Sequence, residues 1–204
     1  MSTWALVGAG GVIGTASGAY AARPLADHYA RRGTVTASLS VLGAALGLAL
    51  AHRLDPAALA ASGLVLLAVA LPLSTIDAVT RKLPDKLVLP AIGGCAGLLL
   101  AGAGTTGDYG SFWRAAAAAA VVFVAFTTLA LIMVGGLGFG DCKAAALCAL
   151  PLGYLGWGNV LHGVLAAYLL AALYIIGRRV AGSASARVAF GPFLFAGTLL
   201  VLLA

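Results

Sequence analysis

Residues 115–134 read AAAAAAVVFVAFTTLALIMV, and residues 135–143 continue GGLGFGDCK. The first stretch is uncharged and apolar, and about 20 such residues in a helix span the hydrocarbon core of a bilayer. It therefore predicts a membrane-spanning helix. The glycines that follow favour a break in that helix, and the break brings an acidic residue, Asp141, to the edge of the membrane.

The rest of the chain shares this apolar character. Of its 204 residues, 62% are hydrophobic and only 9% are charged, and the mean hydropathy is +1.07. These values exclude a soluble globular domain and indicate an integral membrane protein. Because spanning segments use nearly the whole length, we expect one membrane-embedded domain over residues 1–204. The net charge of +6 does not indicate a nucleic-acid partner, because the basic residues interrupt apolar stretches instead of forming a water-facing patch.

Windows without charge predict an all-α, polytopic membrane protein with about eight transmembrane helices. The division between the sixth and the seventh depends on the turn-forming residues Gly153 to Asn159. One long tilted helix over residues 144–177 is the alternative. The predicted helices cover residues 3–22, 34–51, 57–76, 87–104, 115–134, 144–157, 160–177 and 189–204.

Lysine and arginine accumulate in alternate loops of this arrangement, as the positive-inside rule requires of cytoplasmic loops. Ten of the twelve cationic residues fall on one side, which we assign to the cytoplasmic face of the plasma membrane, and Arg53 and Arg114 fall on the other. Both termini then face outward, and Asp77 and Asp141 both lie at cytoplasmic helix ends. The ten residues are Arg23, Arg31, Arg32, Arg81, Lys82, Lys86, Lys143, Arg178, Arg179 and Arg187.

Asp77 closes an apolar stretch that we expect to end before Pro84, because a residue preceding proline avoids the helical region. A carboxylate at this depth carries a desolvation cost, which makes Asp77 a candidate functional residue. The alternative is an ion pair with Arg81, four residues later. Asp85 follows Pro84 among cations, and we expect it to be solvated at the start of the next helix, where an acid is favoured.

Gly138 and Gly140 precede Asp141 in a stretch with few side chains. The backbone there can leave the helical conformation and approach a substrate closely, as irregular backbone does where it lines a cavity. The alternative is that Asp141 only N-caps the next helix, a common role of aspartate after glycine.

Asp77 and Asp141 together indicate a catalytic pair. Two carboxylates brought close together cannot both ionise readily, so they share a proton. One can then act as general base on a water molecule and the other as general acid on a peptide carbonyl, without a metal or a cofactor. No metal site is predicted from Cys95, Cys142 and Cys148, which form no CxxC pair and which we expect to pack as small apolar side chains.

Three motifs occur in order along the chain: Asp77 with Pro84 seven positions later, GFGDCK at residues 138–143, and FGPFL at residues 190–194. In these motifs the chain resembles the type IV prepilin peptidase family of membrane aspartic proteases. The resemblance implies an aspartic endopeptidase that cleaves the short basic leader of type IV prepilin-like precursors at the cytoplasmic face of the membrane. The partners it implies are the precursor protein and the lipid bilayer.

The resemblance also implies residue roles, with Asp77 and Asp141 as the catalytic pair. Supporting roles, for the substrate or the loops around it, are implied for Gly138, Gly140, Lys143 and Pro84. Larger members carry a cytoplasmic domain with a four-cysteine metal site, which is associated with N-methylation. The corresponding residues here, 21–33, are a short loop without cysteine, which implies a short form of the family without that metal site.

Two other functions use the same acids. The stretch from Gly138 to Asp141 is also similar to the GxGD motif of other intramembrane proteases, such as presenilin and signal peptide peptidase. A proton-coupled transporter could use Asp77 and Asp141 as a relay. A cavity shared by both carboxylates at the membrane edge favours a peptidase, whereas acids separated along a pore favour a transporter.

Overall fold

The computed structural model describes residues 32–80, 83–132, 138–182 and 188–204, together with residues 9, 12, 15 and 16. Within these residues the chain folds into seven longer α-helices, which confirms the predicted all-α class. The predicted helix over residues 3–22 lies almost entirely outside the described residues, as does most of the predicted loop over residues 21–33. The helices are α2 (Arg32–Arg53), α3 (Ala57–Thr80), α4 (Asp85–Thr106), α5 (Tyr109–Ile132), α6 (Phe139–Leu155), α7 (Trp157–Val180) and α8 (Gly191–Leu203).

Four of the described helices are long and apolar enough to cross a membrane, as expected of an all-α membrane protein. They cover Ala57–Ala78, Asp85–Thr106, Tyr109–Ile132 and Trp157–Val180. Helices α6 and α8 are shorter, with 17 and 13 residues. Helix α2 has 22 residues, and its side chains are described from Val41 on. The described residues thus do not support the count of about eight, because a window without charge does not separate a helix that crosses lipid from a short helix, such as α6, that is enclosed by protein.

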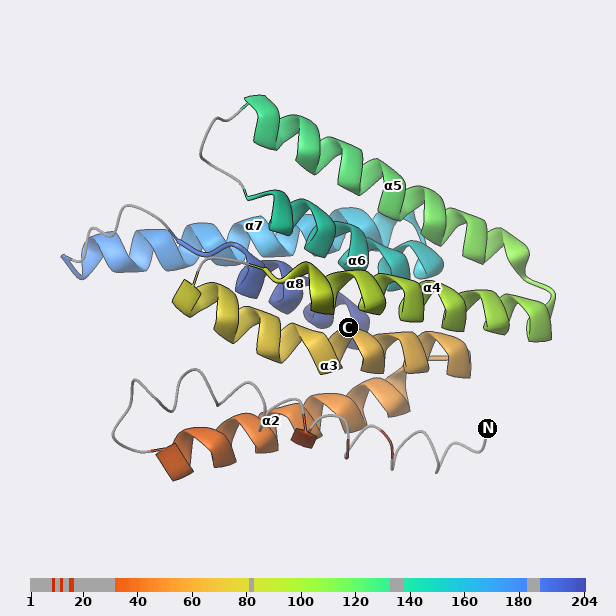
Figure 1. Cartoon of the computed structure of the whole chain (residues 1–204), viewed down its shortest axis with the longest axis horizontal. Coiled ribbons are helices and arrows are strands. Elements are labelled where there is room, and N and C mark those ends of the chain that lie inside the picture. Colours follow the sequence, from red (N-terminus) through yellow and green to blue (C-terminus); the bar gives the residue numbers. More distant parts are fainter. Residues whose placement is uncertain are drawn as a thin grey trace.

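The helices α2 to α8 run in alternating directions, so their ends gather at the two ends of one bundle (Figure 1). The C-terminal end of α3 and the N-terminal ends of α4, α6 and α8 lie at the same end. The predicted separation of α6 from α7 is confirmed, since α6 ends at Leu155 and α7 begins at Trp157. Gly156 between them has a φ of 147°, a conformation that favours glycine.

Helix α6 lies at the centre of the bundle and packs against α5 along much of its length, and also against α3, α4, α7 and α8. Its residues from Ala144 to Tyr154 are all buried. Small side chains make this packing possible: a Cβ atom at Gly153 would lie only 2.6 Å from the Cβ of Ala118 in α5. The cysteines Cys95, Cys142 and Cys148 are buried in the same interior.

Arg114 of α5 caps the C-terminal end of α6. Its Nε donates to the carbonyl oxygen of Gly153 at 2.9 Å, and its Nη2 donates to the carbonyl oxygen of Tyr154. The last carbonyls of a helix have no partner within the helix, and a cation there also complements the helix dipole. This contact explains why a cationic residue occurs at the end of the bundle that carries few of them.

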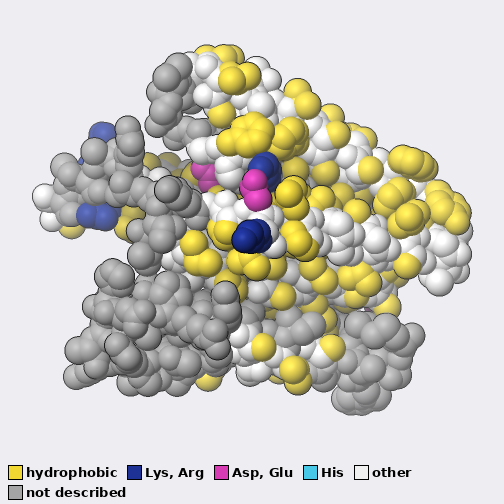
Figure 2. Space-filling view, viewed as in Figure 1, with side chains coloured by type: hydrophobic (Ala, Val, Ile, Leu, Met, Phe, Trp, Pro, Cys, Tyr) yellow, Lys and Arg dark blue, Asp and Glu magenta, His cyan; other side chains and the backbone are white. Residues whose placement is uncertain are grey.

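Charged side chains are distributed unequally between the two ends. Lys86, Lys143 and Arg178 belong to the ends of α4, α6 and α7 that lie together, whereas Arg53 and Arg114 belong to helix ends on the opposite side of the bundle (Figure 1). On the face shown in Figure 2, charged groups gather toward the first of these ends, and the rest of the described surface is hydrophobic or uncharged. The described helices therefore alternate in the way that the predicted topology requires.

Candidate active site

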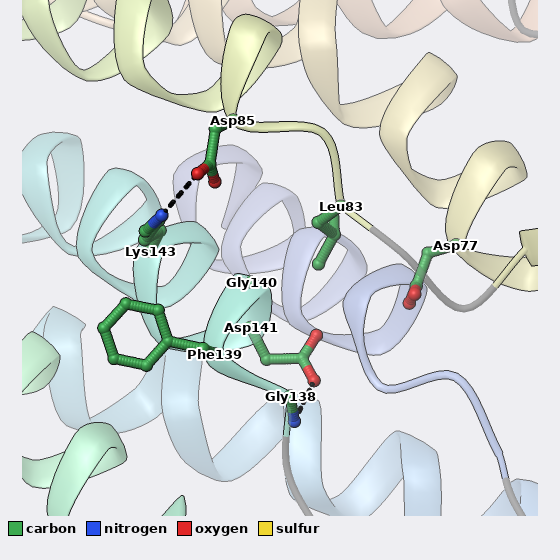
Figure 3. A pocket seen from close by; sticks show the side chains of 8 residues that line it. All are labelled: Asp77, Leu83, Asp85, Gly138, Phe139, Gly140, Asp141 and Lys143. Atoms are coloured by element: carbon green, nitrogen blue, oxygen red, sulfur yellow. Dashed lines mark hydrogen bonds and ion pairs between the residues drawn. The ribbon is translucent and has the colours of Figure 1, made fainter.

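Asp77 and Asp141 line one cavity of about 380 Å³ at the cation-rich end of the bundle. Asp77 lies in the last turn of α3, and Asp141 lies in the first turn of α6. Their carboxylates point toward one another across the cavity (Figure 3). The complete lining consists of Asp77, Leu83, Asp85, Gly138, Phe139, Gly140, Asp141 and Lys143.

Asp77 is buried and is held by the start of α8. Its Oδ2 accepts a hydrogen bond from the backbone N–H of Gly191 at 3.0 Å, and Gly191 is the first residue of α8. The first N–H groups of a helix have no partner within the helix, and they favour a negative charge. Gly191 also leaves space, because a Cβ atom there would lie 2.7 Å from the same oxygen.

The FGPF motif of the sequence contains this glycine, but nothing in the sequence predicts its contact with Asp77, 114 positions earlier. Pro192 fits the second helical position, because its missing N–H would have no helical partner there. Arg81, the alternative partner that the sequence offers for Asp77, lies outside the described residues.

Asp141 closes the N-terminal end of α6 without being its N-cap. Gly138 is the N-cap, with an extended backbone, and its N–H donates to Oδ2 of Asp141 at 3.2 Å. Asp141 is thus the third helical residue, and its side chain makes the half of a capping box that reaches back to the N–H of the N-cap, whereas glycine has no side chain to make the other half. The alternative that Asp141 is the N-cap is therefore wrong in position, and α6 begins at Phe139, five residues before the predicted start at 144.

This early start also corrects the prediction of irregular backbone through Gly140. Gly140 is helical, and its missing side chain serves a close contact: a Cβ atom there would lie 2.8 Å from the Cβ of Leu83. The segment that precedes α4 can therefore pack directly on the first turn of α6. Residues 133–137, which carry the other predicted glycines, lie outside the described residues.

The second carboxylate oxygen of Asp141, Oδ1, is buried and has no hydrogen-bond partner among the described residues. Asp141 lies outside the four membrane-spanning helices. Burial, and then the nearby charge of Asp77, raise the pKa of Asp141 to about 6, although the N–H of Gly138 opposes this shift. Asp141 therefore keeps a proton at a pH where an ordinary aspartate has lost it.

Pro84 is the N-cap of α4, with extended backbone angles, and it does not line the cavity. Its neighbours Leu83 and Asp85 do, and the sequence did not single out Leu83. The proline ring fixes the φ angle of Pro84, which lies between these two residues at the start of α4. The start of α4 at Asp85 agrees with the predicted helix break before Pro84.

Asp85 is the first residue of α4 and its side chain is half exposed, as expected for a solvated helix-start acid. It also forms an ion pair that the sequence did not predict: Nζ of Lys143 lies 2.7 Å from its Oδ2 (Figure 3). The same ammonium lies 5.2 Å from the centre of the Phe139 ring, which favours a cation on its face. Lys143 is therefore fixed at the rim of the cavity.

The arrangement fits acid and base chemistry on a substrate that enters the cavity. One carboxylate accepts a backbone hydrogen bond in the interior, and the other is partly unpartnered and retains a proton more readily. Among the described residues, no group of three His, Cys, Asp or Glu side chains could hold a metal ion.

Comparison with known protein families gives one match. The model of the type IV leader peptidase family matches residues 64–176, which is more than half of the chain and includes both Asp77 and Asp141. No curated protein and no solved structure matches the chain significantly. The match to the family model shows that the chain belongs to the type IV leader peptidase family.

Proposed function

We propose that the protein is a membrane aspartic endopeptidase that removes the leader of type IV prepilin-like precursors. The observation that carries this proposal is the cavity of about 380 Å³ into which Asp77 and Asp141 both point. Membership of the type IV leader peptidase family supports a peptidase that acts on such precursors. The shared cavity also favours a peptidase over a proton relay, which would separate the two acids along a pore.

In the first half of the reaction, Asp77 acts as the base and Asp141 as the acid. Asp77 takes a proton from a water molecule while the water oxygen bonds to the scissile carbonyl carbon. Asp141 gives its proton to the carbonyl oxygen, so the intermediate is a neutral gem-diol. Asp141 suits the acid role because its pKa is raised to about 6, and Asp77 suits the base role because the N–H of Gly191 supports a carboxylate.

In the second half, the C–N bond breaks and the proton on Asp77 passes to the leaving nitrogen. One hydroxyl of the gem-diol returns its proton to Asp141, which restores the starting state of the pair. Only water is consumed, and the products are a carboxylic acid and a free amine.

The site opens at the end of the bundle that carries Lys86, Lys143 and Arg178, and such an end faces the cytoplasm. We assign the site to the cytoplasmic face of the plasma membrane, within the topology of about eight spans that the sequence predicts. With Asp141 protonated and Asp85 paired with Lys143, the carboxylate of Asp77 leaves the cavity lining with a negative charge, which complements a basic leader.

The test is cleavage of a co-expressed, epitope-tagged type IV prepilin, which is detected on a gel as the shift in size when the leader is lost. Asp77→Asn and Asp141→Asn should each abolish cleavage while the protein still accumulates in the membrane. The matched control is Asp55→Asn, which changes an exposed acid between α2 and α3 at the opposite end of the bundle. Cleavage by either dyad variant would refute the assignment of the pair.

A further inference from the structure

One rim of the cavity holds an ion pair between the start of α4 and the start of α6. Asp85 is the first residue of α4, and its carboxylate lies 2.7 Å from Nζ of Lys143. Lys143 lies two residues after Asp141, in the same part of α6. Figure 3 shows this pair, and Leu83 lies against Gly140 beside it.

The pair matters because the helices that carry the acids have little direct contact. Helix α6 packs mainly against α5, and among its neighbours α3 contacts it least. Helices α4 and α8 each pack against both α3 and α6, so the separation of Asp77 from Asp141 depends on how these two helices are seated. At this end of the bundle, the start of α4 meets α6 through the apolar contact of Leu83 with Gly140 and the ion pair of Asp85 with Lys143.

We propose that Asp85 and Lys143 act as a positioning pair, which sets the distance between Asp77 and Asp141. This inference rests on the proposed peptidase function and names residues that control it. Neither residue touches the reacting atoms. The charge pair as a unit holds the start of α4 against the first turns of α6.

The surroundings of Asp85 and Lys143 suit a role in positioning the two acids better than a role in stabilising the fold. The Asp85 side chain is 56% exposed and that of Lys143 is 19% exposed, and an ion pair with one solvated partner adds little to folding stability. The Phe139 ring restricts Lys143, which gives the pair a defined geometry. The rate of catalysis is far more sensitive to small displacements than folding stability is, since a displacement of about 1 Å can lower the rate about 100-fold.

Two other roles would use the same side chains separately. Asp85 could bind a basic residue of the leader, or Lys143 could bind a carbonyl oxygen of the substrate. In both cases the contact is with the substrate, so its loss raises KM, and the losses from the two residues multiply. A positioning pair predicts a loss in kcat, and it predicts that the second substitution adds nothing to the first.

The experiment is a double-mutant cycle on the full-length protein in detergent, with a purified type IV prepilin as substrate. Asp85→Asn and Lys143→Met should each lower kcat about 10- to 100-fold, with KM changed by no more than about twofold. The double variant should be no slower than the slower single variant. Lys143→Arg, which keeps the charge, should retain most of the activity. Lys86→Met, which removes the exposed cation next to Asp85, is the control and should behave as wild type.

Each other result overturns the inference. Multiplying losses, a raised KM with kcat unchanged, or full activity in either single variant would show that the residues do not act as a pair. A variant that fails to fold would show that the pair serves stability instead of geometry. A wild-type protein that does not cleave the prepilin would overturn the proposed function and this inference with it, whereas the other results leave the proposed function intact.

Discussion

At the scale of single residues, the two acids of the candidate site lie in different surroundings. Asp77 accepts the N–H of Gly191 in the interior of the protein. Asp141 uses one oxygen to cap α6, and its other oxygen is buried without a partner among the described residues. Because the pKa of Asp141 is raised to about 6, we expect this residue to hold the proton that the pair shares.

The first prediction concerns the pH dependence of cleavage. Asp141 keeps its proton up to about pH 6 instead of losing it near the ordinary pKa of 3.8, so kcat/KM, which reports the groups of the free enzyme, should fall as the pH rises through about 6. The charge of Asp77 contributes to this shift, so the carboxyl carbon of Asp141 should titrate at a lower pH in Asp77→Asn. The measurements are a pH profile of kcat/KM and a ¹³C NMR titration. A kcat/KM that does not change across pH 6 would contradict the acid role of Asp141.

The second prediction concerns Gly191. Gly191→Ala should lower kcat about 100-fold or more, because the added methyl group would lie 2.7 Å from Oδ2 of Asp77 and would displace that carboxylate. The control is Gly177→Ala in α7, where an added Cβ has no atom within 4 Å. Prepilin cleavage in membranes measures both variants. Equal activity of Gly191→Ala and the wild type would show that Asp77 does not depend on this contact.

At the scale of elements, windows without charge predicted the described helices well. The predicted helix over residues 87–104 corresponds to α4 (Asp85–Thr106), and that over residues 160–177 corresponds to α7 (Trp157–Val180). Charged residues lie at the water interface, so the number of residues between them indicates the length of the helix that they flank. The start of α6 was misplaced, because Asp141 and Lys143 lie inside its first turns, and its N-cap, Gly138, carries no side chain that signals a cap.

The third prediction concerns the C-terminal end of α6. Arg114→Met should lower the free energy of unfolding by about 1–3 kcal/mol, because it leaves the partly buried carbonyl oxygens of Gly153 and Tyr154 without their charged donor. The measurement is thermal unfolding in detergent. Arg53→Met, which changes an exposed cation at the same end of the bundle, should have little effect. Equal stability of the two variants would show that Arg114 does not anchor α6.

At the scale of the whole molecule, the contacts that assemble the site were beyond the sequence. Asp85 and Lys143 are 58 residues apart, and Asp77 and Gly191 are 114 residues apart. The sequence motifs contain Asp77, Lys143 and Gly191. A single sequence does not show, however, which of these motifs contact one another in the folded protein. Alternating helix directions did predict that Asp77 and Asp141 share one end of the bundle, and the described helices place both there.

The fourth prediction concerns orientation in the membrane. The exposed positions Lys86 and Arg53 lie at opposite ends of the bundle, so Lys86→Cys should react with a membrane-impermeant maleimide only in inside-out vesicles, and Arg53→Cys only in intact cells. The natural cysteines are buried, which keeps the background low. The reverse pattern would place the candidate site outside the cell.

If Asp77 and Asp141 work as one catalytic unit, neither acid supports cleavage without the other, and single-turnover cleavage of a purified prepilin by excess protein measures this. Mass spectrometry of the product gives the extent of cleavage for the wild type, Asp77→Asn, Asp141→Asn and the double variant. We predict cleavage by the wild type alone, with the same loss of product in both single variants and in the double variant, because residues that act as a unit lose their effect together. Cleavage by either single variant would contradict the catalytic unit.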